Sequence, residues 1–187
     1  MGVASACGEA LALVVRAAAF AARAHRDQRR KGRRGEPAIN HGIEVARILV
    51  DEAGERDPAL LAAALLHDTV EDTDTTLADI ERRFGAEVAA LVAQVSDDPS
   101  LPRHERRRRQ LEAAAGLEVR AKRLRLADKI ANVRALALDP PPGWSARRRR
   151  EYVAWCRAVV DRLRGVQPAL ERAFDEAYER ALERFRG

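Results

Sequence analysis

Apolar residues recur along most of the chain at the three- and four-residue spacing of helix faces. In residues 9–30 they fall at Leu11, Val14, Val15, Ala18 and Ala22, a pattern that predicts an amphipathic helix. No segment alternates apolar and polar β-branched residues as a half-buried strand does. The pattern predicts further helices over residues 41–53, 58–72, 76–84, 86–95, 103–115, 118–138, 145–164 and 168–185. We therefore expect an all-α fold.

Residues that cap or break helices support these boundaries. Asn40 is a candidate N-cap for the second helix, and Asp57, which precedes a proline, is a good start for the third. Thr76 and Asp79 have the spacing of a capping box. Residues 59–66 are apolar on nearly all sides, which predicts that their helix lies in the core.

Length and composition indicate one globular domain. The chain has 187 residues, of which 47% are hydrophobic, and no internal repeat or long linker divides it, so a single domain over residues 1–187 is expected. Two cysteines exclude a disulfide scaffold or a cysteine-rich zinc module. The longest uncharged apolar run, residues 59–66, is far shorter than the ~20 residues of a membrane span. Without a secretory signal, the expected location is the cytoplasm, with no membrane partner.

Basic residues are almost all arginine. The formal net charge is +5, and 34 basic residues include only three lysines. Such a surface attracts nucleic acid, acidic membranes or phosphorylated small molecules. The arginine runs 106–109 and 147–150 fan around their helices, and neither a nucleic-acid module nor a stacking aromatic surface accompanies them. We expect exposed helix faces and no nucleic-acid partner, with Arg148 as a candidate contact to a substrate phosphate.

The strongest group of ionisable residues directly follows the apolar run, in the sequence His67-Asp68-Thr69-Val70-Glu71-Asp72. On a helix, His67 and Glu71 share one face, and Asp68 and Asp72 share another. Polar side chains beside a core segment are costly unless a metal or water satisfies them. Imidazole and carboxylate together suit a divalent metal.

Two residues far along the chain are candidates to complete this site. His41 lies near the start of the second predicted helix, and Asp128 lies in an otherwise apolar stretch. Each also has an ordinary alternative: His41 as a cap or core hydrogen-bonding group, and Asp128 as an ion-pair partner of a neighbouring basic residue. Together with His67 and Asp68, they would supply four ligands to one metal, with two further acids beside it.

The order His41, His67-Asp68, Asp128 resembles the HD superfamily of metal-dependent phosphohydrolases. The segments that narrow the resemblance are Arg29-Arg30-Lys31, Ile39-Asn40-His41, residues 63–73, Phe84-Gly85, residues 126–132 and Gly143-Trp144-Ser145. They are similar to the hydrolase domain of Rel/SpoT proteins and to the stand-alone small alarmone hydrolases, the Mesh-type group, over residues 10–170. The resemblance implies a single-domain HD-fold helical bundle. It also implies hydrolysis of the 3′-pyrophosphate of guanosine tetra- or pentaphosphate, (p)ppGpp, to GDP or GTP and pyrophosphate, with one Mn²⁺ per chain.

The resemblance also assigns roles to individual residues. It implies that His41, His67, Asp68 and Asp128 bind the metal, and that Glu71 and Asp72 position and deprotonate the attacking water. The residues that it places against the nucleotide are Arg30, Lys31, Arg103, Asn132 and Tyr152.

One residue departs from the family pattern: Ala38 stands where the family usually has tyrosine. The loop 32–35 is also unusually basic. Two alternatives therefore remain, namely a phosphohydrolase of the same fold that acts on another phosphorylated nucleotide, and a non-enzymatic nucleotide-binding module. Glu71 argues against the second, because a protein that only binds has no need of it.

Overall fold

The core of the protein forms around α3 (Pro58–Leu66), whose residues are almost all buried. In the computed structural model, which describes residues 2–186, α3 contacts α1 (Gly2–Ala24), α2 (Ile39–Asp51), α6 (Ala86–Val95) and α8 (Val119–Leu138). The expected cap is confirmed: Asp57 Oδ1 accepts hydrogen bonds from the backbone nitrogens of Ala59, at 2.9 Å, and Leu60, at 3.3 Å. Such a cap contributes about 1 kcal/mol to helix stability.

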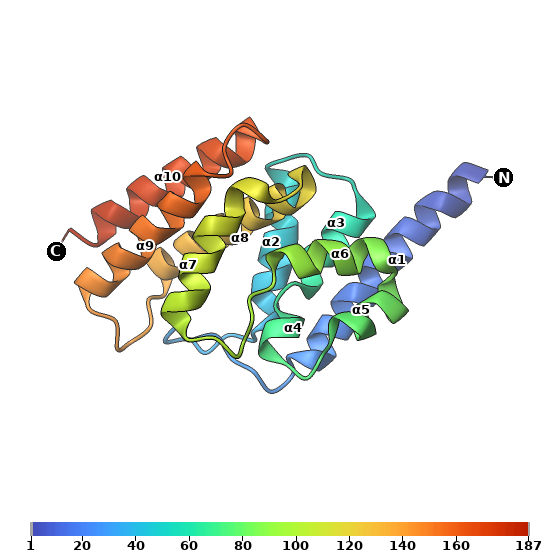
Figure 1. Cartoon of the computed structure of the whole chain (residues 1–187), viewed down its shortest axis with the longest axis horizontal. Helices are drawn as coiled ribbons and strands as arrows, with labels where there is room; N and C mark the ends of the chain where they lie inside the picture. The colour runs from blue at the N-terminus through green and yellow to red at the C-terminus, as the bar shows by residue number, and fades with distance from the viewer. Residues whose placement is uncertain (1, 187) are drawn as a thin grey trace.

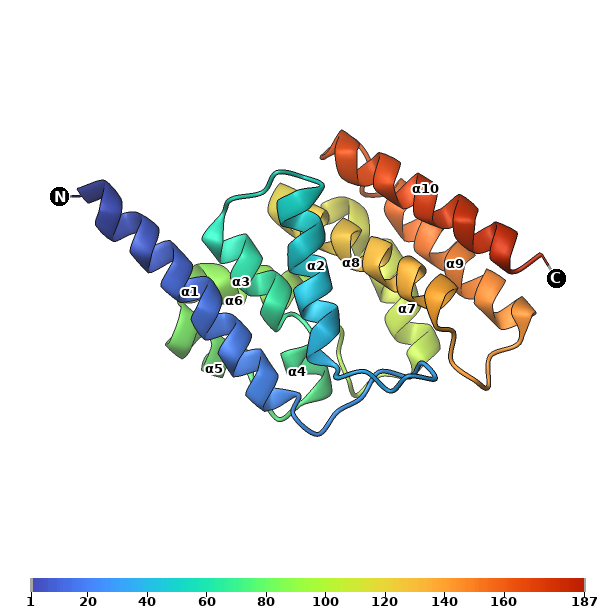
Figure 2. The ribbon, with the colours of Figure 1, turned by 180° about the vertical axis from the view of Figure 1, so that it is seen from behind.

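The other helices cover this core from several sides. They are α4 (Thr69–Asp72), α5 (Leu77–Phe84), α7 (Arg103–Ala113) with a short 3₁₀ turn (Ala114–Gly116), α9 (Ala146–Asp161) and α10 (Pro168–Arg184). Figures 1 and 2 show α9 and α10 at one end of the molecule and α1 at the other, with α8 between them. Because no β-strand occurs in residues 2–186, the expected all-α, single-domain fold is confirmed.

Helices α2 and α3 approach each other closely at Gly42. A Cβ atom placed on Gly42 would lie 3.0 Å from the carbonyl oxygen of Leu65 and 3.4 Å from that of Ala64. The two backbones are therefore nearly in contact at the C-terminal end of α3. This contact brings the start of α2 next to the residues that follow α3.

The first helix ends six residues earlier than the sequence predicts, at Ala24 rather than at residue 30. Residues 25–35 contain no apolar side chain that could pack on the core, and most helical stability in proteins comes from such packing. The chain instead forms a loop, held by an isolated bridge between Arg29 and Pro37 and by a hydrogen bond from Arg30 N to Glu36 O at 2.8 Å.

Two other predicted boundaries are wrong. Asn40 is not a cap, because α2 already begins at Ile39 and Ala38 precedes it without a side-chain hydrogen bond. The third predicted helix is two helices, separated by a turn at residues 67–68. There Thr69 Oγ1 donates a hydrogen bond to Leu66 O at 2.7 Å. Further along the chain, the expected capping box at the start of α5 is present.

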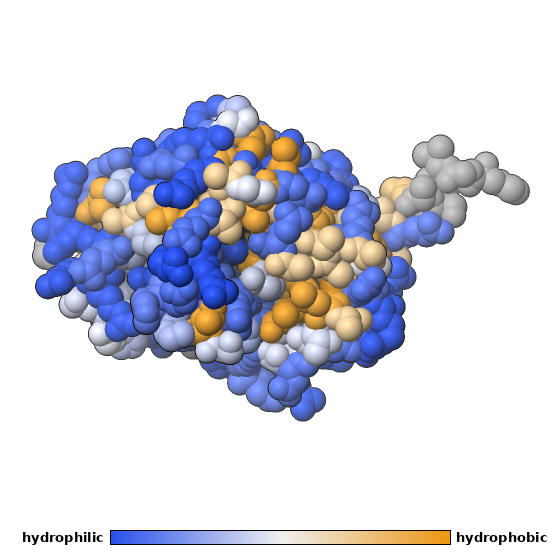
Figure 3. Space-filling view, viewed as in Figure 1, coloured by the Kyte–Doolittle hydropathy of each residue, from blue (hydrophilic) through white to orange (hydrophobic). Residues whose placement is uncertain are grey.

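Polar and apolar residues separate on the surface. Hydrophilic side chains cover α7 on the face seen in Figure 3, whereas apolar side chains gather over α5 and α6. Within the described chain, none of the helices has the length and apolar character that crossing a membrane requires.

Candidate active site

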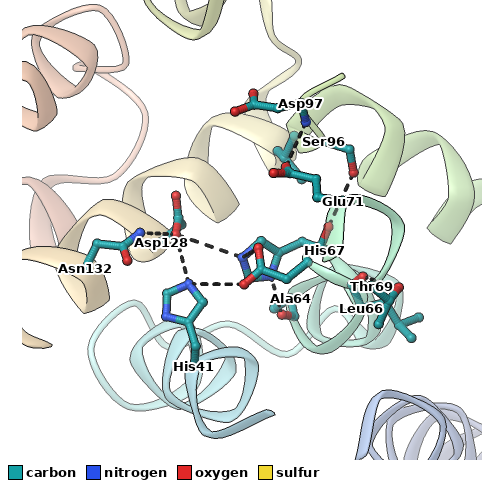
Figure 4. Close-up of polar contacts among 12 residues, drawn as sticks. His41, Ala64, Leu66, His67, Thr69, Glu71, Ser96, Asp97, Asp128 and Asn132 are labelled. Carbon is teal, nitrogen blue, oxygen red and sulfur yellow. Dashed lines mark hydrogen bonds and ion pairs between the residues drawn. The ribbon is translucent and has the colours of Figure 1, made fainter. Parts of the chain in front are cut away.

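Three helices bring two histidines and an aspartate together. His41 lies on α2, His67 in the turn after α3, and Asp128 on α8, and each has a ligand atom within 4.8 Å of the others. Figure 4 shows the three side chains pointing toward one another. His41 Nε2 is 3.0 Å from Asp128 Oδ1, and His67 Nε2 is 3.9 Å from the same oxygen. All three residues are buried.

Asp68 adds a fourth ligand-type side chain to this cluster. Its Oδ1 lies 3.1 Å from His67 Nε2, and its Oδ2 lies 3.8 Å from His41 Nε2. The side chain of Asp68 is 34% exposed, whereas those of His41, His67 and Asp128 are at most 8% exposed. The cluster is therefore buried on three sides and open at Asp68.

The ring of His67 is oriented for metal binding. Its Nδ1 lies 2.8 Å from the carbonyl oxygen of Ala64, which only accepts hydrogen bonds, so Nδ1 carries a hydrogen. In the neutral ring, Nε2 then presents its lone pair to the cluster, as metal-binding histidines do when their other nitrogen donates to a carbonyl. His67 Nε2 is buried and has no hydrogen-bond partner among the described residues. The side chains present therefore fit a divalent cation with mixed nitrogen and oxygen ligands.

Opposite charges dominate the electrostatics of the cluster. Burial alone would lower the pKa of His67, but the carboxylates of Asp68 and Asp128 outweigh it and raise that pKa to about 9. Burial would likewise raise the pKa of Asp68, yet His67 and His41 hold it well below its usual range. For Asp128, Lys129 and His41 outweigh burial and also lower the pKa. Both carboxylates therefore remain ionised, as metal ligands must be.

Asp128 is held by a network on α8. Lys129 Nζ donates to Asp128 Oδ2 at 3.0 Å, and Asn132 Nδ2 donates to Oδ1 at 2.5 Å. Arg125 Nη1 lies 3.8 Å from Oδ2, while its Nη2 donates to Val95 O at 2.6 Å. The ion-pair role that the sequence left open for Asp128 is thus present, alongside its place in the cluster.

Two cavities meet at this cluster. One, which we call the recess, has a volume of about 230 Å³ and contains His41, His67 and Asp128 in its lining. The other, which we call the larger cavity, has a volume of about 560 Å³. The residues that line both are Arg30, Asp68, Arg103, Asn132 and Tyr152. The buried part of the cluster therefore lies in the recess, and Asp68 lies where the recess meets the larger cavity.

The two predicted acids face different cavities. Glu71 lines the recess with His67, and Asp72 lines the larger cavity with Asp68, so residues four apart share a side as their spacing predicts. The carboxylate of Glu71 accepts a hydrogen bond from Asp97 N at 2.7 Å (Figure 4). Burial, together with the Asp97 carboxylate, raises the pKa of Glu71 to about 7.

Asp72 also titrates at higher pH than an ordinary carboxylate. Burial, followed by repulsion from Asp68, raises its pKa, although His25 and Lys31 act in the opposite direction. A carboxyl group whose pKa lies closer to neutral pH is suited to take up and release protons.

The walls of the two cavities differ in polarity. The larger cavity has an apolar wall made of Ala38, Ala135, Leu136, Leu138, Pro141 and Trp144. The recess has a cationic wall made of Arg103, Arg106, Arg107, Arg125 and Lys129. An apolar slot beside a cationic chamber suits a ligand that carries a flat ring at one end and phosphate groups at the other.

The predicted substrate-binding residues are almost all at the cavities. Lys31 lines the larger cavity, while Arg30, Arg103, Asn132 and Tyr152 line both. Arg148 lines neither; its guanidinium carbon lies 4.5 Å from the centre of the Trp144 ring. It therefore reaches the larger cavity only through that tryptophan.

A carboxylate on the opposite wall fixes the basic loop that carries Lys31. Asp139, which follows α8, accepts hydrogen bonds from the backbone nitrogens of Arg33 and Arg34, both at 3.1 Å. A Cβ atom on Gly32 would collide with this carboxylate. The glycine thus allows the loop to close onto Asp139 and keeps Lys31 at the cavity.

Several residues of the recess do not stand out in the sequence. Arg106, Arg107 and Gln110 line it together with Arg103, and their spacing of three, four and seven residues is the signal that could have identified them. Trp155, on the same helix as Tyr152, also lines it.

Known proteins are similar to this chain in sequence and fold. The HD domain family matches residues 17–154. The guanosine-3′,5′-bis(diphosphate) 3′-pyrophosphohydrolase MESH1 of Mus musculus is 51% identical over 172 residues, which cover 92% of this chain and 96% of that protein. The MESH1 protein of Drosophila melanogaster is 48% identical over 159 residues, covering 85% of this chain and 89% of that protein.

A solved structure has the same arrangement of helices. It is described as a metazoan ortholog of SpoT that hydrolyzes ppGpp and plays a role in starvation responses. It superposes with a TM-score of 0.87 at 46% sequence identity, covering 90% of this chain and 94% of that one. The chain therefore belongs to the HD domain family, in the group that contains the MESH1 proteins.

Proposed function

We propose that this protein hydrolyses (p)ppGpp, releasing pyrophosphate from the ribose 3′ position and leaving GDP or GTP. The observation that carries the proposal is the buried cluster of His41, His67 and Asp128 in a cationic recess, which Asp68 connects to an apolar-walled cavity. A guanine nucleoside with phosphate groups on both sides of its ribose matches this division. The activity of the similar MESH1 proteins supports the same assignment.

We further propose that His41, His67, Asp68 and Asp128 hold one Mn²⁺ ion. Two imidazoles and two carboxylates are a donor set that Mn²⁺ accepts. When bound, a divalent cation lowers the pKa of a coordinated water and polarises phosphoryl oxygens. The hydrogen bond from His67 Nδ1 to Ala64 O and those from Lys129 and Asn132 to Asp128 orient the ligands.

The remaining chemistry falls to the acids. Glu71, held by the hydrogen bond from Asp97 N, takes a proton from the attacking water as its oxygen adds to the phosphorus bonded to O3′. The bond between that phosphorus and O3′ breaks. O3′ leaves with a proton taken from solvent water, and Glu71 returns the proton that it holds to solvent. Asp72 faces the larger cavity beside Asp68, where it holds the ribose in position.

The side chains shared by both cavities orient the substrate. Arg30 and Arg103 contact phosphate oxygens, and Asn132 and Tyr152 hold the ribose beside the cluster. Lys31 and the stacked pair of Arg148 and Trp144 lie toward the outer end of the nucleotide. A cytoplasmic location stays a prediction from the sequence.

Product analysis tests this proposal. The protein is reconstituted with Mn²⁺ and incubated with ppGpp, and the products are separated by ion-exchange chromatography. We expect GDP and pyrophosphate in equal amounts. Release of orthophosphate would contradict the proposed bond cleavage. No turnover of ppGpp by metal-loaded protein, with turnover of another phosphorylated nucleotide, would instead assign a different substrate to the same fold.

A further inference from the structure

One face of α7 points into the recess. Its residues Arg103, Arg106, Arg107 and Gln110 all line this cavity. Arg108 lies outside it, paired with Glu105 and with Glu112 on the exposed side of the helix. The four consecutive arginines are therefore divided, since two face the recess and two face solvent.

Two of the α7 arginines that face the recess, Arg106 and Arg107, are not paired with an acidic side chain of the described residues. Arg107 lies against two neighbouring aromatic rings, with its guanidinium carbon 5.1 Å from the centre of the Tyr152 ring and 5.0 Å from that of Trp155. Arg106 Nε is buried and has no hydrogen-bond partner in residues 2–186. Cations held in this way attract an anion strongly, because little water screens them.

The net charge around the recess also favours an anion. Six arginine and lysine side chains and four carboxylates line it, which gives a net charge of +2 before any divalent cation is added. Burial and the neighbouring Arg107 and Arg148 lower the pKa of Arg103, which shows that the cations repel one another. A polyanion in the recess would relieve this repulsion.

Size and position narrow the identity of that anion. The recess, at about 230 Å³, is smaller than the ~300–1,000 Å³ of pockets that hold drug-sized ligands. It contains Glu71 and the cluster, whereas the apolar wall that suits a nucleoside belongs to the larger cavity. The group on the far side of the cleaved bond from the nucleoside is the pyrophosphate.

We propose that the recess is the subsite for the pyrophosphoryl group that is transferred to water, and that Arg107 is its principal ligand. The inference rests on the proposed function. After water adds to the phosphorus and the bond to O3′ breaks, pyrophosphate stays in the recess while GDP occupies the larger cavity. Inorganic pyrophosphate therefore binds the protein without GDP, and the two products bind at the same time.

Titration calorimetry with each product tests this assignment. The full chain is loaded with Mn²⁺, freed of excess metal and titrated separately with inorganic pyrophosphate and with GDP. Arg107→Gln should weaken pyrophosphate binding by about tenfold or more, since a charge-assisted hydrogen bond is lost. Its GDP affinity should stay within about twofold of the wild-type value. Arg108→Gln, one residue further on the exposed side, should change neither affinity.

Further measurements serve as controls for the Arg107→Gln variant. Arg107→Lys keeps the charge but loses the planar fork, so its pyrophosphate affinity should fall between those of the wild type and Arg107→Gln. Circular dichroism shows whether each variant folds. In steady-state assays, pyrophosphate should inhibit hydrolysis of ppGpp, and its inhibition constant should rise in Arg107→Gln as the calorimetric affinity falls.

The outcomes separate the possible sources of the bound group. If Arg107→Gln weakens GDP and leaves pyrophosphate unchanged, the recess holds the 5′-diphosphate and the assignment is overturned. Unchanged affinity for both products also overturns it. If pyrophosphate binds in an Arg107-dependent way but ppGpp is not hydrolysed, the anion subsite stands and the proposed reaction fails.

Discussion

The two cavities meet at Asp68 but differ in the side chains that line them. The larger cavity carries apolar side chains such as Leu136 and Trp144, which gain from covering a flat ring. The recess carries cations such as Arg107 that its own carboxylates do not balance. The larger cavity can therefore select a ligand by shape, and the recess selects it by charge.

Changing a carboxylate of the cluster should have the largest effect. Asp128→Asn keeps the size of the side chain but removes the charge that belongs to the cluster. We expect a loss of activity of about 10⁴-fold or more, because metal-dependent stabilisation of the transition state is worth several kcal/mol. Activity assays and elemental analysis of bound manganese measure this. Asp161→Asn, on the outer side of α9, is the matched control and should behave as the wild type.

Changing the acid on the recess side should have the next largest effect. Glu71→Gln retains an oxygen that can accept the hydrogen bond from Asp97 N but cannot take a proton from water. We expect kcat to fall about 10²- to 10³-fold, in the range of general-base catalysis, with KM nearly unchanged. Steady-state kinetics decide the point. A raised KM with normal kcat would mean that Glu71 only binds substrate, and Glu81→Gln on α5 serves as the control.

Removing the ring of Trp144 should act mainly on the larger cavity, since the ring lines that cavity and reaches the recess only through its contact with Arg103. Its loss in Trp144→Ala should raise KM about tenfold, as expected when one base loses an aromatic partner. The same variant should weaken binding of GDP in calorimetry but leave pyrophosphate binding unchanged. This result would mirror that of Arg107→Gln, and equal weakening of both products would show that the two cavities are not independent.

The smallest expected effect is on stability, and it depends on pH. The pKa of Glu71 is about 7 in the folded protein, above the ~4.3 of an unfolded chain. The folded protein therefore favours the protonated form of Glu71. This preference adds fully to the free energy of unfolding below about pH 4, and the contribution is lost as pH rises through 7. Asp97 and Asp68 repel the ionised form, and Arg125 attracts it.

Glu71→Gln is neutral at every pH and should avoid this loss. After allowance for solvent screening, we expect the free energy of unfolding of the metal-free variant to exceed that of the metal-free wild type by about 1–2 kcal/mol at pH 8. Near pH 4 we expect no difference. Urea unfolding at both pH values measures the free energy. A gap that is equal at both pH values would assign the effect to packing rather than to ionisation.

Local sequence signals predicted most of the framework. The cap at Asp57 and the capping box at Thr76 depend on neighbouring residues, and both are present. The end of α1 at Ala24 was not predicted. The regular spacing of apolar residues ends at Ala22, whereas the predicted helix continued to residue 30. The turn at residues 67–68 was missed for a different reason, since it depends on contacts from other helices, such as the hydrogen bond from Ser96 Oγ to His67 O at 3.3 Å.

The site was predictable where its chemistry is rare in the sequence. His41 and Asp128 stand out in apolar surroundings, and the structure brings them together although 87 residues separate them. Arg107 did not stand out, because it is one of four identical neighbours. Only the packing of α7 against Tyr152 and Trp155 distinguishes it from Arg108.

The absence of a side chain at Gly42 makes this site fragile to mutation. A single base change converts a glycine codon to one for alanine, and the added methyl group would press on the carbonyl oxygens of Leu65 and Ala64. The Ala64 oxygen is the one that fixes the ring of His67, and His41 is the residue directly before the glycine. One methyl group could therefore shift both histidines at once, so activity could be lost through a position that binds neither metal nor substrate.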